Sequence, residues 1–319
     1  MLNSVEARIR GAGIVPVIKL DKVEDARPLG EALVDGGICV AEVTFRSEAA
    51  AEGIREMSSN ADMLVGAGTV LTLDQLDAAL EAGAQFIVSP GFNPKIVKAC
   101  MERGVSIFPG CSSPTDIEQA LELGLRTVKF FPAESLGGLD TIKALSGPYG
   151  DISFIPTGGI SPKNIGQYIR YPKVVACGGS WMVSAQAIAA GDFFSVTAAT
   201  KASVKELLGF GIEHVGINCT DQDELERTIG LFCVLFDMEQ DERASVTFAD
   251  TLIECGTGLV QGKPHIAIGT NSAECAYHHL LRRGAKFLEE TKKVDENGRL
   301  RAIYLAEDFG GMAVHILQR

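Results

Sequence analysis

The sequence of 319 residues contains no apolar run that approaches the ~20 residues needed by a membrane-spanning helix. Its first residues, MLNSVEARIRGAG, include acidic side chains and lack the long apolar core of a signal peptide. We therefore expect a cytoplasmic protein that has no membrane partner.

Positive charge and paired cysteines are also scarce. The chain has 29 Lys and Arg against 41 Asp and Glu, and its net charge of −12 disfavours nucleic acid as a partner, because phosphate binding needs a basic surface. An anionic substrate must therefore meet local positive charge. The eight cysteines include no CxxC pair, unlike those of a zinc ribbon or a disulfide scaffold, and this favours reduced, buried thiols.

One pattern repeats along the first two-thirds of the chain: an apolar run, a stop rich in Gly, Pro, Ser or Thr, and an amphipathic stretch. The apolar runs predict eight strands, over residues 14–20, 39–46, 63–70, 85–91, 105–111, 126–133, 153–160 and 174–180. The amphipathic stretches predict helices, among them residues 23–37, 72–83, 93–104 and 113–124, several with an N-cap residue. Eight alternating units indicate an α/β fold of the (β/α)8 TIM-barrel type.

A doubly wound open sheet is the competing arrangement. The turn after the first strand lacks the glycines of a dinucleotide-binding fingerprint, which disfavours that arrangement. Glycine pairs follow the seventh and eighth strands instead, in PTGGI and CGGSW, where a barrel commonly binds phosphate. Paired glycines also form plain turns, so each pair alone leaves both interpretations open.

Lys129 lies in an otherwise apolar run, TVKFF, near the C-terminal end of the sixth predicted strand. Catalytic residues of barrels lie at that end of the strands. Burial among Val128, Phe130 and Phe131 favours the neutral amine, which is the nucleophilic form of lysine. The alternative is a structural lysine whose ammonium reaches the barrel rim.

Glu42 occupies a similar place on the second predicted strand, and Arg46 follows at its end. A carboxylate inside the same barrel can transfer protons, and an arginine can hold a substrate carboxylate through two hydrogen bonds. A buried ion pair without a catalytic role remains the alternative for Glu42 alone. Together with Lys129 and the anion-binding loops, these residues suggest Schiff-base chemistry on a small anionic keto acid.

Six motifs make a resemblance specific: EVTFR, GAGTVL, SPG, TVKFFPAE, PTGGISP and GGSW. In this order and spacing, between about residue 3 and about residue 205, the chain resembles the class I aldolases that cleave 2-keto-3-deoxy-6-phosphogluconate (KDPG) or 4-hydroxy-2-oxoglutarate (KHG). The expected aldolase domain covers residues 1–208. Phe45 departs from the family pattern, since leucine is more usual there.

The resemblance implies that Lys129 forms the Schiff base and that Glu42 is the general acid/base. It places the substrate-binding residues at Arg46, Thr69, Pro90, Phe131, Thr157, Gly158, Gly159, Gly179 and Ser180. It further implies a lyase that yields pyruvate with glyceraldehyde 3-phosphate from KDPG, or with glyoxylate from KHG. The family needs no cofactor and is typically homotrimeric.

Two other functions compete with the aldolase. A sugar-phosphate epimerase or isomerase barrel would use the same glycine loops but would not need Lys129. A non-catalytic sensor of a sugar acid would pass its signal to a second domain, and the presence of Lys129, Glu42 and Arg46 speaks against it.

A second domain is expected over residues 212–319, where long helices no longer alternate with strands. EHVGINCTDQDELERTI and PHIAIGTNSAECAYHHL share an apolar strand begun by histidine, a polar turn and an amphipathic helix. TLIECG and AVHILQ correspond at the ends of the two halves. Halves of about fifty residues are too short to fold separately, so we expect them to pair into one smaller α+β domain.

This repeat is similar to the glyoxalase, or vicinal-oxygen-chelate, superfamily, in which two βαβββ modules enclose a divalent metal. The resemblance implies a transition-metal site at His214, Glu254, His265 and His315, which have ligand-type side chains. His315 is a departure, since glutamate is more usual at that position. Packed histidines without a metal, and an oligomerisation or regulatory module, remain the alternatives.

Overall fold

The computed structural model describes residues 4–243 and 246–319. The chain divides into two compact units, unit 1 over Met1–Leu207 and unit 2 over Leu208–Arg319. The division falls one residue before the expected end of the aldolase domain. Within the described residues, no helix is both long and apolar enough to cross a membrane. Within the described residues the eight cysteines form no disulfide, and six of them are buried.

Unit 1 contains all eight predicted strands. They are β1 (Ile14–Ile18), β2 (Val40–Thr44), β3 (Leu64–Gly68), β4 (Phe86–Val88), β5 (Ser106–Phe108), β6 (Thr127–Phe130), β7 (Ser153–Pro156) and β8 (Cys177–Gly179). Because both faces are covered, short continuous apolar segments form these strands: every residue of β2 and of β3 is buried.

The strands form a parallel, curled sheet of the α/β class. One sheet has the order β5-β4-β3-β2-β1-β8, and β6 pairs with β7. Parallel bridges from Gly110 to Lys129 and from Thr157 to Gly178 link the second group to both ends of the first. The C-terminal ends of all eight strands therefore lie on one side, where β2 and β6 can bring their side chains together.

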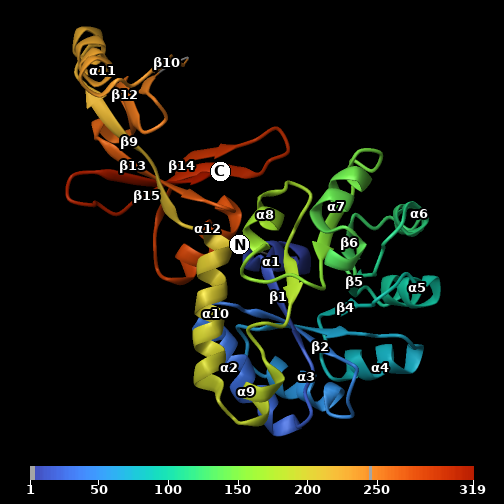
Figure 1. Cartoon of the computed structure of the whole chain (residues 1–319). Coiled ribbons are helices and arrows are strands. Elements are labelled where there is room, and N and C mark those ends of the chain that lie inside the picture. Colours follow the sequence, from blue (N-terminus) through green and yellow to red (C-terminus); the bar gives the residue numbers. More distant parts are fainter. Residues whose placement is uncertain (1–3, 244–245) are drawn as a thin grey trace. The chain divides into compact units, whose positions relative to one another are not determined.

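Helices cover these strands, most of them around the outside (Figure 1), whereas the first helix faces the interior, where its Ile9 lines the same cavity as Glu42 and Lys129. The helices are α1 (Val5–Ala12), α2 (Ala26–Gly36), α3 (Ala50–Ser58), α4 (Leu73–Glu81), α5 (Pro94–Glu102), α6 (Pro114–Glu122), α7 (Gly138–Ser146), α8 (Ile165–Arg170), α9 (Ala185–Ala189) and α10 (Phe193–Leu208). The cap residues begin helices as predicted: Thr72, Asn93 and Ser113 each accept a hydrogen bond from the first turn of the following helix. Short 3-10 turns lie at Val23–Asp25 and Glu134–Leu136 in unit 1 and at Val260–Gly262 in unit 2.

Unit 2 is rich in sheet and repeats one order of elements. The first half has β9 (Gly211–Cys219), α11 (Gln222–Phe236), β10 (Gln240–Glu242), β11 (Thr247–Ala249) and β12 (Ile253–Thr257). The second half has β13 (His265–Thr270), α12 (Ala273–Arg282), β14 (Phe287–Val294), β15 (Leu300–Leu305) and β16 (Ala313–Gln318). All eight strands join one sheet in the order β10-β11-β12-β9-β13-β16-β15-β14, so β9 and β13 join the two halves at its centre.

One detail of the predicted repeat is wrong. β13 begins at His265, but β9 begins at Gly211, so His214 is the fourth residue of its strand. The extra residues of β9 pair with β13, because Ile212 lies opposite Ile268 and Gly211 opposite Gly269. Pairing with a partner strand that is distant in sequence therefore extends β9 beyond its local apolar pattern.

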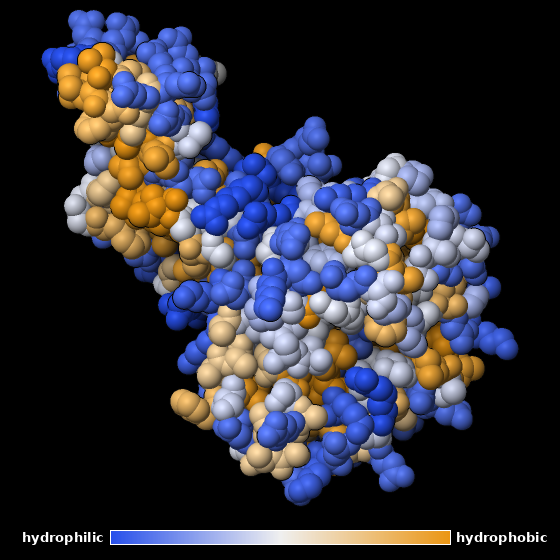
Figure 2. Space-filling view, in the orientation of Figure 1, coloured by the Kyte–Doolittle hydropathy of each residue, from blue (hydrophilic) through white to orange (hydrophobic). Residues whose placement is uncertain are grey.

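Helix α11 has two different faces. Leu225 and Ile229 are buried against the sheet, whereas Val234, Leu235 and Phe236 are exposed. Figure 2 shows hydrophobic residues gathered on this part of unit 2. Phe232 also packs against the core, so most of the large apolar side chains left exposed lie in the last turn of the helix.

Candidate active site and metal centre

Lys129 and Glu42 meet inside unit 1. Lys129 Nζ lies 3.3 Å from Glu42 Oε1, and the two residues are only 6% and 3% exposed. They come from β6 and β2, which are not neighbours, so the pair spans the interior of the curled sheet. The structure thus places an amine and a carboxylate within proton-transfer distance, away from bulk water.

The surroundings of this pair are apolar. A cavity that contains the pair is lined by Ile9, Val15, Glu42, Phe86, Val88, Phe108, Lys129, Ile155, Thr157 and Gly178. The ring of Phe131 has its centroid 5.4 Å from Lys129 Nζ on another side. Few groups besides Glu42 can therefore stabilise a charge on the lysine.

Gly68, at the end of β3, makes room for the carboxylate. A Cβ atom added there would lie 2.1 Å from Glu42 Oε1 and 2.6 Å from Glu42 Cγ. The position of Gly68 beside Glu42 was not predicted, although a glycine inside a strand often marks the close approach of another group. Gly68 belongs to the GAGTVL motif.

Arg46 and Thr69 follow the C-terminal ends of β2 and β3. Arg46 is exposed, and its Nε donates a hydrogen bond of 3.0 Å to Thr44 Oγ1. No carboxylate of residues 4–243 or 246–319 forms an ion pair with Arg46, so its guanidinium can bind an incoming carboxylate. Thr69 has φ 57°, a value that is strained for a β-branched residue and typical of functional sites.

Pro90 and Phe131 follow β4 and β6 at the same ends of the strands. Pro90 is partly buried, and Phe131 is 37% exposed. An exposed aromatic ring beside a buried amine can cover a bound substrate, which fits the lining role expected for this residue.

The two glycine motifs lie side by side. Thr157 pairs with Gly178 through a bridge, and a Cβ added at Gly178 would lie 2.3 Å from Thr157 Oγ1. Gly158 and Gly159 have φ 97° and 83°, in the left-handed region that favours glycine. Gly179 is the last residue of β8 and Ser180 follows it, so all five predicted residues of these motifs lie at the ends of β7 and β8.

Comparison with known proteins identifies the family. Residues 5–199 match the family of KDPG and KHG aldolases. The chain belongs to that aldolase family. The prediction of a class I aldolase, made from the six motifs, is therefore confirmed, and neither the epimerase nor the sensor is the family that matches.

Curated relatives match almost over their whole length. A 2-dehydro-3-deoxy-phosphogluconate aldolase of Treponema pallidum is 54% identical over 193 residues, which are 60% of this chain and 92% of the relative. A KHG/KDPG aldolase of Escherichia coli K12 is 41% identical over 204 residues, 64% of this chain and 96% of the relative.

Solved structures agree. A KDPG aldolase of Zymomonas mobilis superposes with a TM-score of 0.60 at 38% identity, covering 63% of this chain and 96% of that one. A KDPG aldolase of Legionella pneumophila was solved with pyruvate captured as a covalent carbinolamine. It superposes with a TM-score of 0.60 at 37% identity, covering 63% of this chain and 98% of that one. The family match ends before unit 2 begins.

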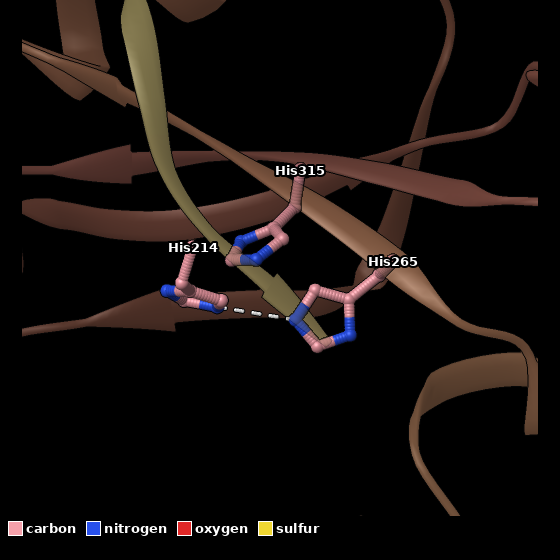
Figure 3. A group of neighbouring side chains, drawn as sticks. All are labelled: His214, His265 and His315. Atoms are coloured by element: carbon pink, nitrogen blue, oxygen red, sulfur yellow. Dashed lines mark hydrogen bonds between the residues drawn. The ribbon is translucent and has the colours of Figure 1, made fainter. Parts of the chain in front are cut away.

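In unit 2 of this aldolase, the predicted ligand residues converge. His214, His265 and His315 come from β9, β13 and β16, and their rings point toward one another (Figure 3). His214 Nε2 lies 3.1 Å from His265 Nε2. Glu254, from β12, places Oε2 3.0 Å from His214 Nε2 and 3.7 Å from His265 Nε2. Four central strands thus bring four donor side chains to one point.

The electrostatics of this cluster suit a cation. Burial opposes ionisation of Glu254, but hydrogen bonds from His214 and His265 outweigh it and lower its pKa to about 2. Burial, with the neighbouring His265 and His214, lowers the pKa of His315 to about 3. At neutral pH the cluster therefore offers a carboxylate and a neutral imidazole, the forms that bind metals.

Unsatisfied ring nitrogens support the same conclusion. His265 Nδ1 and both ring nitrogens of His315 are buried without a hydrogen-bond partner among the described residues. Such groups are costly unless something pairs with them. Metal–nitrogen bonds of about 2.0–2.1 Å put two tetrahedral donors about 3.3 Å apart. The separations of 3.0, 3.1 and 3.7 Å among His214, Glu254 and His265 lie around that value, and ligand nitrogens of the three histidines lie within 4.8 Å of one another. The spacing of these residues therefore fits a divalent transition metal.

Aromatic neighbours of the cluster were not predicted. The ring of Tyr304 stacks on that of His315, with centroids 4.5 Å apart, and Phe248 meets His214 edge to face at 5.5 Å. Tyr304 lies opposite His315 in the pairing of β15 with β16. Only strand register reveals this contact, and register between the two strands is not visible in the repeat pattern.

Proposed function

We propose that Lys129 is the Schiff-base nucleophile and Glu42 the proton-transfer group with which this aldolase cleaves KDPG to pyruvate and glyceraldehyde 3-phosphate. The observation that carries the assignment is the buried contact of 3.3 Å between Lys129 Nζ and Glu42 Oε1. Membership of the KDPG and KHG aldolase family supports it. KHG, cleaved to pyruvate and glyoxylate, is the second substrate.

The reaction begins with a proton transfer. Glu42 takes a proton from the ammonium of Lys129, and the free amine attacks the C2 carbonyl carbon of the substrate. Glu42 then returns a proton to the resulting hydroxyl, which leaves as water and gives a protonated imine.

Bond cleavage follows from the imine. Loss of the C4 hydroxyl proton, with Glu42 as the base, breaks the C3–C4 bond and releases the aldehyde. The bonding electrons move into the iminium and leave an enamine on Lys129. Protonation at C3 and hydrolysis then release pyruvate and the free lysine.

The residues around the pair bind the substrate. Arg46 and Thr69 hold the pyruvate end, since an exposed guanidinium at the rim can bind a carboxylate through two hydrogen bonds. Pro90 and Phe131 line the pocket. The motifs Thr157–Gly159 and Gly179–Ser180 receive the phosphate of KDPG, supported by the left-handed glycines that leave the backbone open.

Replacement of Lys129 tests this assignment. The Lys129→Ala protein should keep its fold and lose detectable cleavage of KDPG, followed as pyruvate release. A folded variant with the rate of the unsubstituted enzyme would contradict the Schiff-base mechanism.

We also propose a finer description of the molecule. The ring of pairings and bridges through β1 to β8 supports a (β/α)8 barrel, and the repeated order of elements in unit 2 supports two βαβββ modules of the glyoxalase type. The family resemblance adds a homotrimeric assembly, and the sequence pattern supports a cytoplasmic location.

For unit 2 we propose a divalent transition-metal centre held by His214, Glu254, His265 and His315. Its support is the convergence of four donors that leaves buried ring nitrogens unpaired. Such a metal supplies Lewis acidity to a chelating ligand. Full-length protein purified without a tag or a chelator should contain about one such metal per chain, and protein that takes up none of Zn, Ni, Co, Mn and Fe would refute the centre.

A further inference from the structure

The four proposed ligands alternate with small residues across the sheet of unit 2. Gly216 lies opposite Glu254 on one side and opposite His265 on the other. Ala267 lies opposite both His214 and His315 in the neighbouring row. Each proposed ligand therefore has a small residue beside it, and the space above that residue lets the ligand side chain extend toward the other three.

Gly216 is the tightest of these positions. A Cβ added there would lie 2.1 Å from Cε1, 2.3 Å from Nδ1 and 2.6 Å from Nε2 of His265. Real Cβ atoms do not approach other atoms so closely, so the ring would have to move. The backbone itself does not need a glycine here, because the φ of Gly216 lies outside the left-handed region.

The imidazole has little room to move. His265 is 2% exposed, and its ring packs against those of His214, His315 and Tyr304 at centroid distances of 5.3, 5.1 and 5.9 Å. A displaced ring would carry Nε2 away from the position 3.1 Å from His214 Nε2.

We infer that Gly216 is the positioning residue of the metal centre: the missing side chain lets His265 lie over β9 and place Nε2 beside the other donors. The inference rests on the proposed metal centre. A substitution at Gly216 therefore changes the position of the His265 ring and leaves the imidazole itself unaltered.

Cobalt binding by the full-length protein tests the inference. Metal-free protein is titrated with Co²⁺, and the d–d absorption bands report both affinity and the ligand set. Gly216→Ala should weaken Co²⁺ binding by about 10- to 100-fold, the loss typical when ligand orientation is disturbed, and should alter the bands. The matched control is Gly230→Ala in α11, where an added Cβ meets nothing within 4 Å, and this variant should bind as the unsubstituted protein does.

The outcomes separate the inference from the proposed centre. Equal affinity and equal spectra for Gly216→Ala and the unsubstituted protein would overturn the inference alone. If the unsubstituted protein binds no Co²⁺, the metal centre itself is refuted and the inference with it.

A double-mutant cycle covers the case in which Gly216→Ala disturbs folding. Without metal, Gly216→Ala should lower the free energy of unfolding of unit 2 in urea. The same change in a His265→Ala background should lower that free energy much less, because the clashing ring is gone. Equal costs in both backgrounds would overturn the steric basis of the inference.

Discussion

Glutamine at position 42 tests the catalytic role of the carboxylate with little change of shape. The carboxamide has nearly the volume of the carboxylate, and Glu42 is 3% exposed in β2, so Glu42→Gln should still pack between Gly68 and Lys129. It cannot take up a proton from Lys129 at the observed 3.3 Å. Lys129 then lacks the acceptor for its proton, and the C4 hydroxyl loses its base.

The expected fall in kcat follows from the rate enhancement that general acid–base catalysis supplies. Such assistance typically contributes about 100- to 10,000-fold, so kcat for KDPG should fall by a factor in that range. At 1.36 kcal/mol for each factor of ten, the barrier rises by about 2.7–5.4 kcal/mol. Removal of the carboxylate also leaves Lys129 without its charged partner inside the curled sheet, so some loss of stability is expected.

Pyruvate release, coupled to oxidation of NADH by lactate dehydrogenase, measures kcat, and thermal unfolding shows that the variant is folded at the assay temperature. The matched control is Glu48→Gln, which removes an exposed carboxylate shortly after the same strand and should leave kcat unchanged. A Glu42→Gln enzyme with the kcat of the unsubstituted protein would refute the catalytic role and leave a structural ion pair.

Two further predictions concern the phosphate loop and the independence of the two units. A Cβ at Gly159 would lie 2.5 Å from Glu134 Cβ, so Gly159→Val should displace the loop and raise KM for KDPG far more than KM for KHG; equal effects would mean that the glycine only shapes the turn. His265→Ala, or treatment with a chelator, should remove the proposed metal from unit 2 while kcat for KDPG stays unchanged, because the proposed amine and carboxylate mechanism uses no metal. A parallel fall in kcat would contradict that independence.

Local patterns in the sequence were enough to predict the strands and to single out Lys129 and Glu42, which the structure brings together. Lys129 is conspicuous because an ammonium interrupts an apolar strand, and the caps at Thr72 and Ser113 act within a single turn of helix. Such signals depend only on neighbours along the chain.

Contacts between distant segments could not be predicted in this way. Gly68 makes room for Glu42 from the adjacent strand, and Tyr304 stacks on His315 through strand register. The start of β9 at Gly211 likewise depends on its pairing with β13. Each feature is a property of two chain segments at once, and the composition of either segment alone does not encode it.

The central claim, that Lys129 forms the Schiff base, is tested most directly by chemical trapping. Full-length protein is incubated with pyruvate and sodium borohydride, digested, and analysed by peptide mass spectrometry, with Lys129→Ala treated in parallel. We predict one reduced pyruvate adduct, on Lys129, and none on the Lys129→Ala protein, because a reducible imine forms where a neutral amine meets the keto carbon. An active enzyme whose Lys129 remains unmodified after this treatment, or whose adduct lies on another lysine, would contradict the account.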